Sequence, residues 1–287
     1  MATVSNGNDA VYRVTVREFP SSIEVTTKPV NHELERARSL NHGFKGAPKL
    51  LELSEEERAL KDEENVVRSI RRAKQAVRWQ VQRLEADHLL TLTYRENMQD
   101  IDRLKRDFDV FRRLVKARYP EWGYVAAREQ QERGAWHLHL AVKGRQDIKY
   151  LRTCWYKVLG CLGAVGLAVL GAVNIKPPTK RFSDSGHWRS NKLASYLTKY
   201  IDKAFDLLER SSKRYWSSKG LPQSVVTRYW LAGDALEIIQ DAFDLAMYHG
   251  MEDFPAVLHQ SLQRSLIYMQ GFRYKNCFSG DNDVLQG

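Results

Sequence analysis

The alternation of hydrophobic and polar residues predicts several short β-strands in this chain. Two alternating stretches, residues 11–16 and 23–27, lie on either side of Pro20. The polar link around Gly134 has the length of a hairpin turn between two further strands. In all, four strands are expected in the middle of the chain, at residues 89–94, 123–129, 136–142 and 173–176.

Apolar residues at helical spacing predict helices between these strands. Ser54 and Glu57 form a capping-box pattern, which indicates a helix that runs to about Arg83 with a break near Asn65. Residues 100–117 carry one apolar face, made of Ile101, Leu104, Phe108, Phe111 and Leu114. Helices are also expected at residues 147–159, at residues 191–208 and through most of the chain after Pro222.

The order strand–helix–strand–strand–helix–strand is that of a ferredoxin-like or split βαβ unit. We therefore expect an α+β fold, in which an antiparallel β-sheet carries helices on its face and helical additions lie at both ends. The expected divisions are an N-terminal extension of strand and loop, a basic helical segment, the sheet-bearing domain and a C-terminal helical region. Their expected boundaries are residues 1–50, 51–88, 89–220 and 221–287.

The longest apolar stretch, residues 158–173, is too short to span a bilayer comfortably and contains four glycines. We interpret it as a buried helix or a helix–turn–strand passage, and we expect no membrane partner. Residues 1–9 show no apolar secretory signal. The three cysteines form no CxxC pair, which fits a reducing compartment. Together these features favour a cytoplasmic protein.

The positive charge of the chain suggests a nucleic-acid partner. The formal net charge is +10 and the sequence pI is about 9.4, and a polyanion releases condensed counterions when it binds such a surface. The expected helix holds no acid between Arg68 and Arg83. A solvated face that binds nothing explains this run equally well. If the helix does bind DNA, the phosphate contacts are expected from Arg68, Arg71, Arg72, Lys74 and Arg78.

Two histidines lie within the expected strand 136–142. Strand alternation places His137 and His139 on the same sheet face. Glu129 ends the preceding strand across the hairpin, and it can add a carboxylate to the pair. This donor set predicts a metal site but leaves zinc, manganese, iron and magnesium open. A His-x-His pair alone also occurs in strands that bind no metal.

Two tyrosines share one face of the expected helix 191–208. Tyr196 and Tyr200 are one turn apart, and Lys199 and Lys203 form a second such pair beside them. A phenol has an ordinary pKa near 10, so a nucleophilic tyrosine needs a base or a nearby positive charge. The alternative is that both tyrosines belong to an ordinary apolar core stripe with solvated lysines behind it.

These motifs together resemble the HUH endonucleases, specifically the replication initiators (Rep) of rolling-circle plasmids and of filamentous and other single-stranded DNA phages. Residues 89–94 resemble the first motif, a hydrophobic strand with two threonines, and residues 136–140 resemble the His–hydrophobic–His motif. Residues 196–203 match the nucleophile helix in its two-tyrosine form, and residues 214–220 resemble a stretch that follows it. The resemblance covers about residues 68–220.

The resemblance implies a metal-dependent DNA nickase with a tyrosine nucleophile and Mg²⁺ or Mn²⁺ as its cofactor. Glu129 falls where such proteins carry a third metal ligand, whereas Trp136 stands where many of them have proline. One tyrosine would form a 5′-phosphotyrosine link and leave a free 3′-hydroxyl, and the second would serve strand closure. The adjacent Lys199 and Lys203 favour Tyr200 as the first nucleophile.

The implied partners are single-stranded or supercoiled origin DNA and a host DNA polymerase that extends the 3′ end in the cytoplasm of a bacterial host cell. The chain lacks a GxxxxGK[ST] phosphate loop, so we expect no nucleotide cofactor and a separate host helicase. Aromatic residues that stack on unpaired bases are expected near the site. The candidates are Trp122, Trp136, Trp188 and Trp216.

Two other functions are compatible with parts of the pattern. A cupin-like or other metal-dependent oxygenase can use two histidines and a glutamate. It would ordinarily need a further histidine or an all-β barrel, and the expected helices oppose that fold. A non-catalytic basic DNA-binding protein would retain DNA but form no covalent product.

Overall fold

The structure is a computed structural model that describes residues 11–30, 54–176, 186–205, 213–253 and 267–273. Side chains are described within these ranges except at residues 186–189, 202–205, 253, 267 and 272–273. The chain forms two compact units. The central unit comprises residues 53–222, and the terminal unit combines residues 1–52 with residues 223–287.

The central unit is built on an antiparallel sheet with the strand order β6-β3-β5-β4-β7. The order along the chain is β3, α3, β4, β5, α4 and β6, so the predicted split βαβ unit is confirmed. The strands are β3 (His88–Tyr94), β4 (Tyr124–Gln130), β5 (Trp136–Val142), β6 (Gly171–Lys176) and β7 (Tyr215–Ser217).

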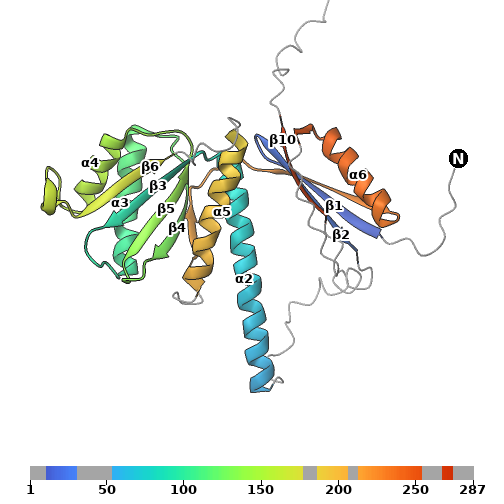
Figure 1. Cartoon of the computed structure of the whole chain (residues 1–287), viewed down its shortest axis with the longest axis horizontal. Helices are drawn as coiled ribbons and strands as arrows, with labels where there is room; N and C mark the ends of the chain where they lie inside the picture. Colours follow the sequence, from blue (N-terminus) through green and yellow to red (C-terminus); the bar gives the residue numbers. More distant parts are fainter. Residues whose placement is uncertain (1–10, 31–53, 177–185, 206–212, 254–266, 274–287) are drawn as a thin grey trace, which may run out of the picture. The chain divides into compact units, whose positions relative to one another are not determined.

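Helices cover both faces of this sheet. The helices α3 (Ile101–Arg118) and α4 (Ile148–Val158) bury one face, where Phe111 and Trp155 pack against strand residues such as Leu138. The helices α2 (Glu55–Leu84) and α5 (Gly186–Phe205) pack on the other face. Figure 1 shows the resulting layers, with α3 and α4 on one side of the sheet and α5 and α2 on the other.

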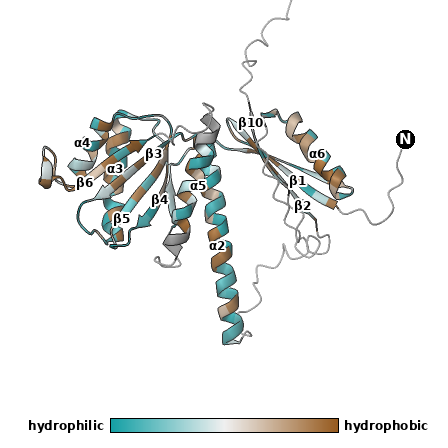
Figure 2. Cartoon of the chain, viewed as in Figure 1, coloured by the Kyte–Doolittle hydropathy of each residue, from teal (hydrophilic) through white to brown (hydrophobic). Residues whose placement is uncertain are grey.

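Helix α2 begins with the predicted capping box, because the Ser54 side chain accepts from Glu57 N while the Glu57 side chain accepts from Ser54 N. The helix is continuous through Asn65, so the expected break is wrong. Its last turns bury Val77 and Val81 against α5. Most residues before Ala73 are exposed, and Figure 2 shows that hydrophilic residues predominate along the helix.

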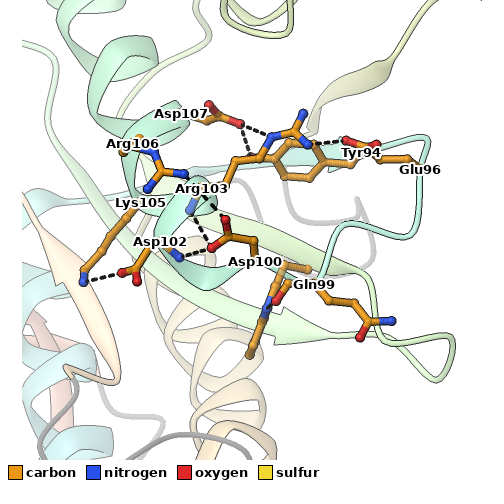
Figure 3. Close-up of polar contacts among 10 residues, drawn as sticks. Tyr94, Glu96, Gln99, Asp100, Asp102, Arg103, Lys105, Arg106 and Asp107 are labelled. Atoms are coloured by element: carbon orange, nitrogen blue, oxygen red, sulfur yellow. Dashed lines mark hydrogen bonds and ion pairs between the residues drawn. The ribbon is translucent and has the colours of Figure 1, made fainter.

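A network of polar contacts fixes the start of α3 beside the end of β3 (Figure 3). Asp100 caps the helix by accepting from the backbone N–H groups of Asp102 and Arg103 at 2.8 and 3.0 Å. The Tyr94 hydroxyl donates to Asp107 at 2.9 Å. Burial, followed by the charge of Asp107, raises the pKa of this phenol. Tyr94 therefore stays protonated and anchors the strand end to the helix.

The apolar stretch 158–173 is a helix–turn–strand passage, one of the two predicted alternatives. It leaves α4, turns through Gly160, Gly163 and Gly166, which all have positive φ, and enters β6. Val165 and Leu167 are 82% and 83% exposed, so the turn is not a buried helix. None of the described helices combines the length and the hydrophobicity that a membrane crossing needs.

The terminal unit contains a second antiparallel sheet, with the strand order β8-β1-β2-β10-β9. Helix α6 (Ala235–Tyr248) packs on one face of it, and Ala242 and Ala246 contact the valines of β1 and β2. The predicted N-terminal strands are confirmed. The strands are β1 (Val11–Glu18), β2 (Ser22–Pro29), β8 (Val225–Ala232), β9 (Met251–Asp253) and β10 (Ile267–Arg273).

The expectation of a mainly helical region after residue 220 is correct only for α6. Strands β8, β9 and β10 lie where helix was expected. The physical reason is that β8 is rich in β-branched and aromatic residues and pairs with β1, more than 200 positions away. Such long-range pairing leaves little trace in local periodicity.

Candidate functional site

The register of the central sheet gathers the predicted metal ligands on the face that α2 and α5 cover. His137 lies opposite Glu129 of β4 and Thr93 of β3, while His139 lies opposite Ala127 and Thr91. Leu138 and Leu140 point to the other face, into the α3–α4 core. The sequence prediction that both imidazoles share a sheet face is confirmed.

Glu129, His137 and His139 form a cluster that can hold a metal ion. Their candidate ligand atoms all lie within 4.8 Å of one another. His139 Nε2 lies 2.8 Å from Glu129 Oε2. His137 Nε2 is buried and has no hydrogen-bond partner among the described residues. A buried, unpartnered imidazole nitrogen beside a carboxylate is what a metal ligand requires, so the residues fit such an ion.

Thr91 orients His139 from the neighbouring strand. Its Oγ1 lies 3.2 Å from His139 Nδ1. When Nδ1 carries the proton and donates to this hydroxyl, the Nε2 lone pair faces Glu129. Sequence analysis assigned Thr91 only to a threonine-containing strand. Its signal is its alternation with Thr93, which places both threonines on the histidine face.

The surroundings of the two histidines favour their neutral forms. Burial is the first cause that lowers the pKa of His137, and the neighbouring His139 lowers it further. Burial also lowers the pKa of His139, against the opposing effect of Glu129. Both imidazoles therefore keep a lone pair for a cation at neutral pH.

Helix α5 places both predicted tyrosines against His139. The Tyr200 ring is stacked on the imidazole, with 4.4 Å between ring centroids and 10° between ring planes. The Tyr196 ring meets the same imidazole edge to face at 5.7 Å and the Tyr200 ring at 5.0 Å. The two phenols and the histidine–glutamate cluster thus form one site.

The electrostatic surroundings of the two tyrosines differ from those expected from the sequence. The Tyr200 side chain is only 8% exposed, and burial raises its pKa, followed by the hydrogen bond with Tyr196 and the charge of Glu129. Lys199 is exposed, and no lysine is among the causes that shift this pKa. The Lys203 side chain lies outside the described residues. The described neighbours therefore keep Tyr200 protonated.

The other candidate residues vary in exposure. Arg68, Arg71 and Arg72 of α2 are exposed, whereas Lys74 and Arg78 are partly buried. The four candidate tryptophans do not form a stacking platform. Trp122 and Trp136 belong to the α3–α4 core, Trp216 is stacked on Phe108 with 5.5 Å between ring centroids, and the Trp188 side chain lies outside the described residues.

Sequence reasoning missed a buried arginine next to Glu129. Arg128 is 2% exposed, and its guanidinium lies 4.9 Å from the centre of the Trp216 ring. Its Nη2 donates to the Lys213 carbonyl. Burial, and then the charge of Arg214, lowers the pKa of Arg128 to about 10. This contact holds β4, and with it Glu129, against the segment that follows α5.

A family model for replication-associated proteins of the ORF2 type matches residues 87–205. No curated protein and no solved structure shows a significant match to the chain. The family match runs from β3 to the end of α5 and includes Glu129, both histidines and both tyrosines. It supports a replication initiator of the Rep type, whose DNA partner is a replication origin.

Proposed function

We propose that this chain initiates DNA replication by nicking one strand of an origin, with the tyrosines of α5 as nucleophiles. The observation that carries the proposal is the position of His139, which contacts both tyrosine rings while its Nε2 faces Glu129. A phosphate held at this cluster would lie beside two phenols of one helix. The family match supports the replication part of the proposal.

Glu129, His137 and His139 would hold a divalent cation. When bound, such an ion polarises a phosphoryl oxygen and offsets the charge that develops during transfer. The donor set also suits zinc or iron, so the proposal of Mg²⁺ or Mn²⁺ follows from the resemblance to Rep nickases. The neutral imidazoles supply lone pairs, and Thr91 holds one of them in its ligand orientation.

The reaction would exchange one phosphate ester for another. The phenol oxygen forms a bond to phosphorus while the bond between phosphorus and the 3′-oxygen breaks. The phenol proton is lost, and the departing 3′-oxygen gains a proton as it becomes a free hydroxyl. A host polymerase would extend that hydroxyl, and a host helicase would unwind the duplex.

We assign the first attack to Tyr196 and the second to Tyr200, the reverse of the expectation from the lysine pattern. Tyr196 is partly exposed, whereas Tyr200 is buried against His139. The hydrogen bond between the phenols favours the protonated form of Tyr200. Tyr200 can therefore donate to the Tyr196 oxygen and stabilise its phenolate.

The test is incubation of the full-length protein with supercoiled replicon DNA and Mn²⁺, followed by denaturing electrophoresis and mass-spectrometric mapping of the adduct. We expect a covalent link at Tyr196, its loss in Tyr196→Phe, and near-normal first nicking but defective closure in Tyr200→Phe. A link only at Tyr200 reverses the assignment. Retention of DNA without any covalent product indicates instead a non-catalytic DNA-binding protein.

A further inference from the structure

One face of the sheet in the terminal unit is not covered by any helix in the described part of the chain. Helix α6 buries the opposite face against Val14, Val16 and Val25. Because side chains alternate along a strand, Arg13 and Arg17 of β1 point away from α6. We call this second side the open face.

The register lines up cations and an aromatic ring across the open face. Arg13 of β1 lies between Trp230 of β8 and Lys28 of β2 in one cross-strand row. Arg228 of β8 belongs to the next row, and Arg17 to the row after that. Adjacent rows are about 7 Å apart, since two strand residues separate them. Positive charge therefore recurs in three successive rows.

Charge is segregated between the two sides of the terminal unit. The open face carries Arg13, Arg17, Lys28 and Arg228, and its acid, Glu24, is 5% exposed and accepts from the Tyr268 hydroxyl at 3.1 Å. Helix α6 has no lysine or arginine. It carries Glu237, Asp241 and Asp244, and Asp234 caps it. A polyanion would thus be attracted to the open face and repelled by α6.

Trp230 gives the open face an apolar contact surface. Its side chain is 57% exposed, and its cross-strand neighbour is Arg13. An exposed indole within a row of cations matches what binds single strands without sequence preference, because bases stack on the ring while cations contact phosphates. Paired bases within a duplex offer no such free face.

We propose that the open face of the terminal unit binds single-stranded DNA, with Trp230 as a stacking platform and Arg13, Arg228 and Lys28 as phosphate contacts. This site is separate from the histidine–tyrosine cluster. The inference rests on the proposed function only for the source of the strand, which would be the unpaired or displaced strand at the nicked origin.

The experiment measures binding of fluorescent oligo(dT) to the full-length protein in EDTA, so that cleavage does not contribute. We expect Trp230→Ala to weaken binding by about tenfold and Trp230→Phe to restore most of it, because a phenyl ring still stacks. The double variant Arg13→Gln and Arg228→Gln should reduce the slope of log affinity against log salt by about 1.4, or about 0.7 for each lost contact.

Matched controls lie on the α6 side. Tyr248→Ala removes an aromatic side chain that is 81% exposed, and Asp241→Asn changes the net charge by one unit; both should leave affinity unchanged. Ultraviolet crosslinking of oligo(dT) to the wild-type chain should label the tryptic peptide 229–264, which contains Trp230.

Unchanged affinity and salt slope in the variants, together with no crosslink on that peptide, overturns the proposal. Tighter binding of duplex than of single strand by the open face also overturns it. A wild-type protein that never forms a phosphotyrosine link, yet loses oligo(dT) affinity in Trp230→Ala, refutes the nicking function and leaves this site standing.

Discussion

Replacement of Thr91 by valine tests whether the second strand of the site supports the metal centre. Valine keeps the shape and the strand preference of threonine but removes Oγ1. The lost contact is the one between Thr91 Oγ1 and His139 Nδ1, at 3.2 Å. His139 would then lose the partner that directs its Nε2 lone pair towards Glu129.

The expected loss is a roughly tenfold weaker affinity for Mn²⁺. Removal of a group that orients a ligand typically costs about 10–100-fold in metal affinity. The distance of 3.2 Å is at the long end of hydrogen-bond lengths, so the lower value, about 1.4 kcal/mol, applies. Folding stability should change little, because Thr91 is only partly buried and valine suits a strand.

Titration of the full-length protein with Mn²⁺, followed by calorimetry or by electron paramagnetic resonance of free Mn²⁺, measures the affinity directly. Thr93→Val is the matched control, because Thr93 lies on the same strand face opposite His137 but has no described hydrogen bond to a histidine. Equal affinities for wild type and Thr91→Val, or equal losses in the two variants, would refute the orienting role. A wild-type chain that binds no Mn²⁺ removes the metal assignment itself.

Three further changes test other parts of the structure. His137→Ala should abolish nicking while DNA affinity and thermal unfolding stay near wild type, and nicking at the normal rate by this variant would exclude the metal assignment. Charge reversal of Arg71, Arg72 and Arg78 together should weaken binding to every DNA sequence and flatten its salt dependence, whereas an unchanged slope would remove α2 from the interface. Gly171→Ala should destabilise the central unit by about 1–3 kcal/mol in urea, because the added methyl group would collide with the Thr93 carbonyl and the Trp155 ring, and a stability loss below about 0.5 kcal/mol would show that these groups can move aside.

The metal cluster could be predicted from the sequence because its geometry is local. One strand carries both histidines, and a short hairpin brings Glu129 opposite His137. Strand alternation and hairpin register are enough to place three ligands on one face. Helix α2 was equally accessible, because a capping box depends on only four consecutive residues.

The state of the tyrosines could not be predicted, because it depends on packing. Helical spacing places Tyr196 and Tyr200 on one face, but it does not say which of them is buried. The charge on Lys199, one position away, is the strongest local signal in the sequence. The fold buries Tyr200 against His139 and leaves Lys199 exposed, so desolvation outweighs that lysine.

The terminal unit shows the same limit on a larger scale, and the limit bears on function. Its sheet joins β1 and β2 to β8 and β10, so the two ends of the chain form one layer although the central unit separates them in sequence. Neither end alone contains a row of cations, because Arg13 and Arg228 become neighbours in adjacent rows only after β1 pairs with β8. The open face therefore exists only in the folded chain. If it binds single-stranded DNA, both ends of the chain are required for that binding, and loss of either β1 or β8 should abolish it.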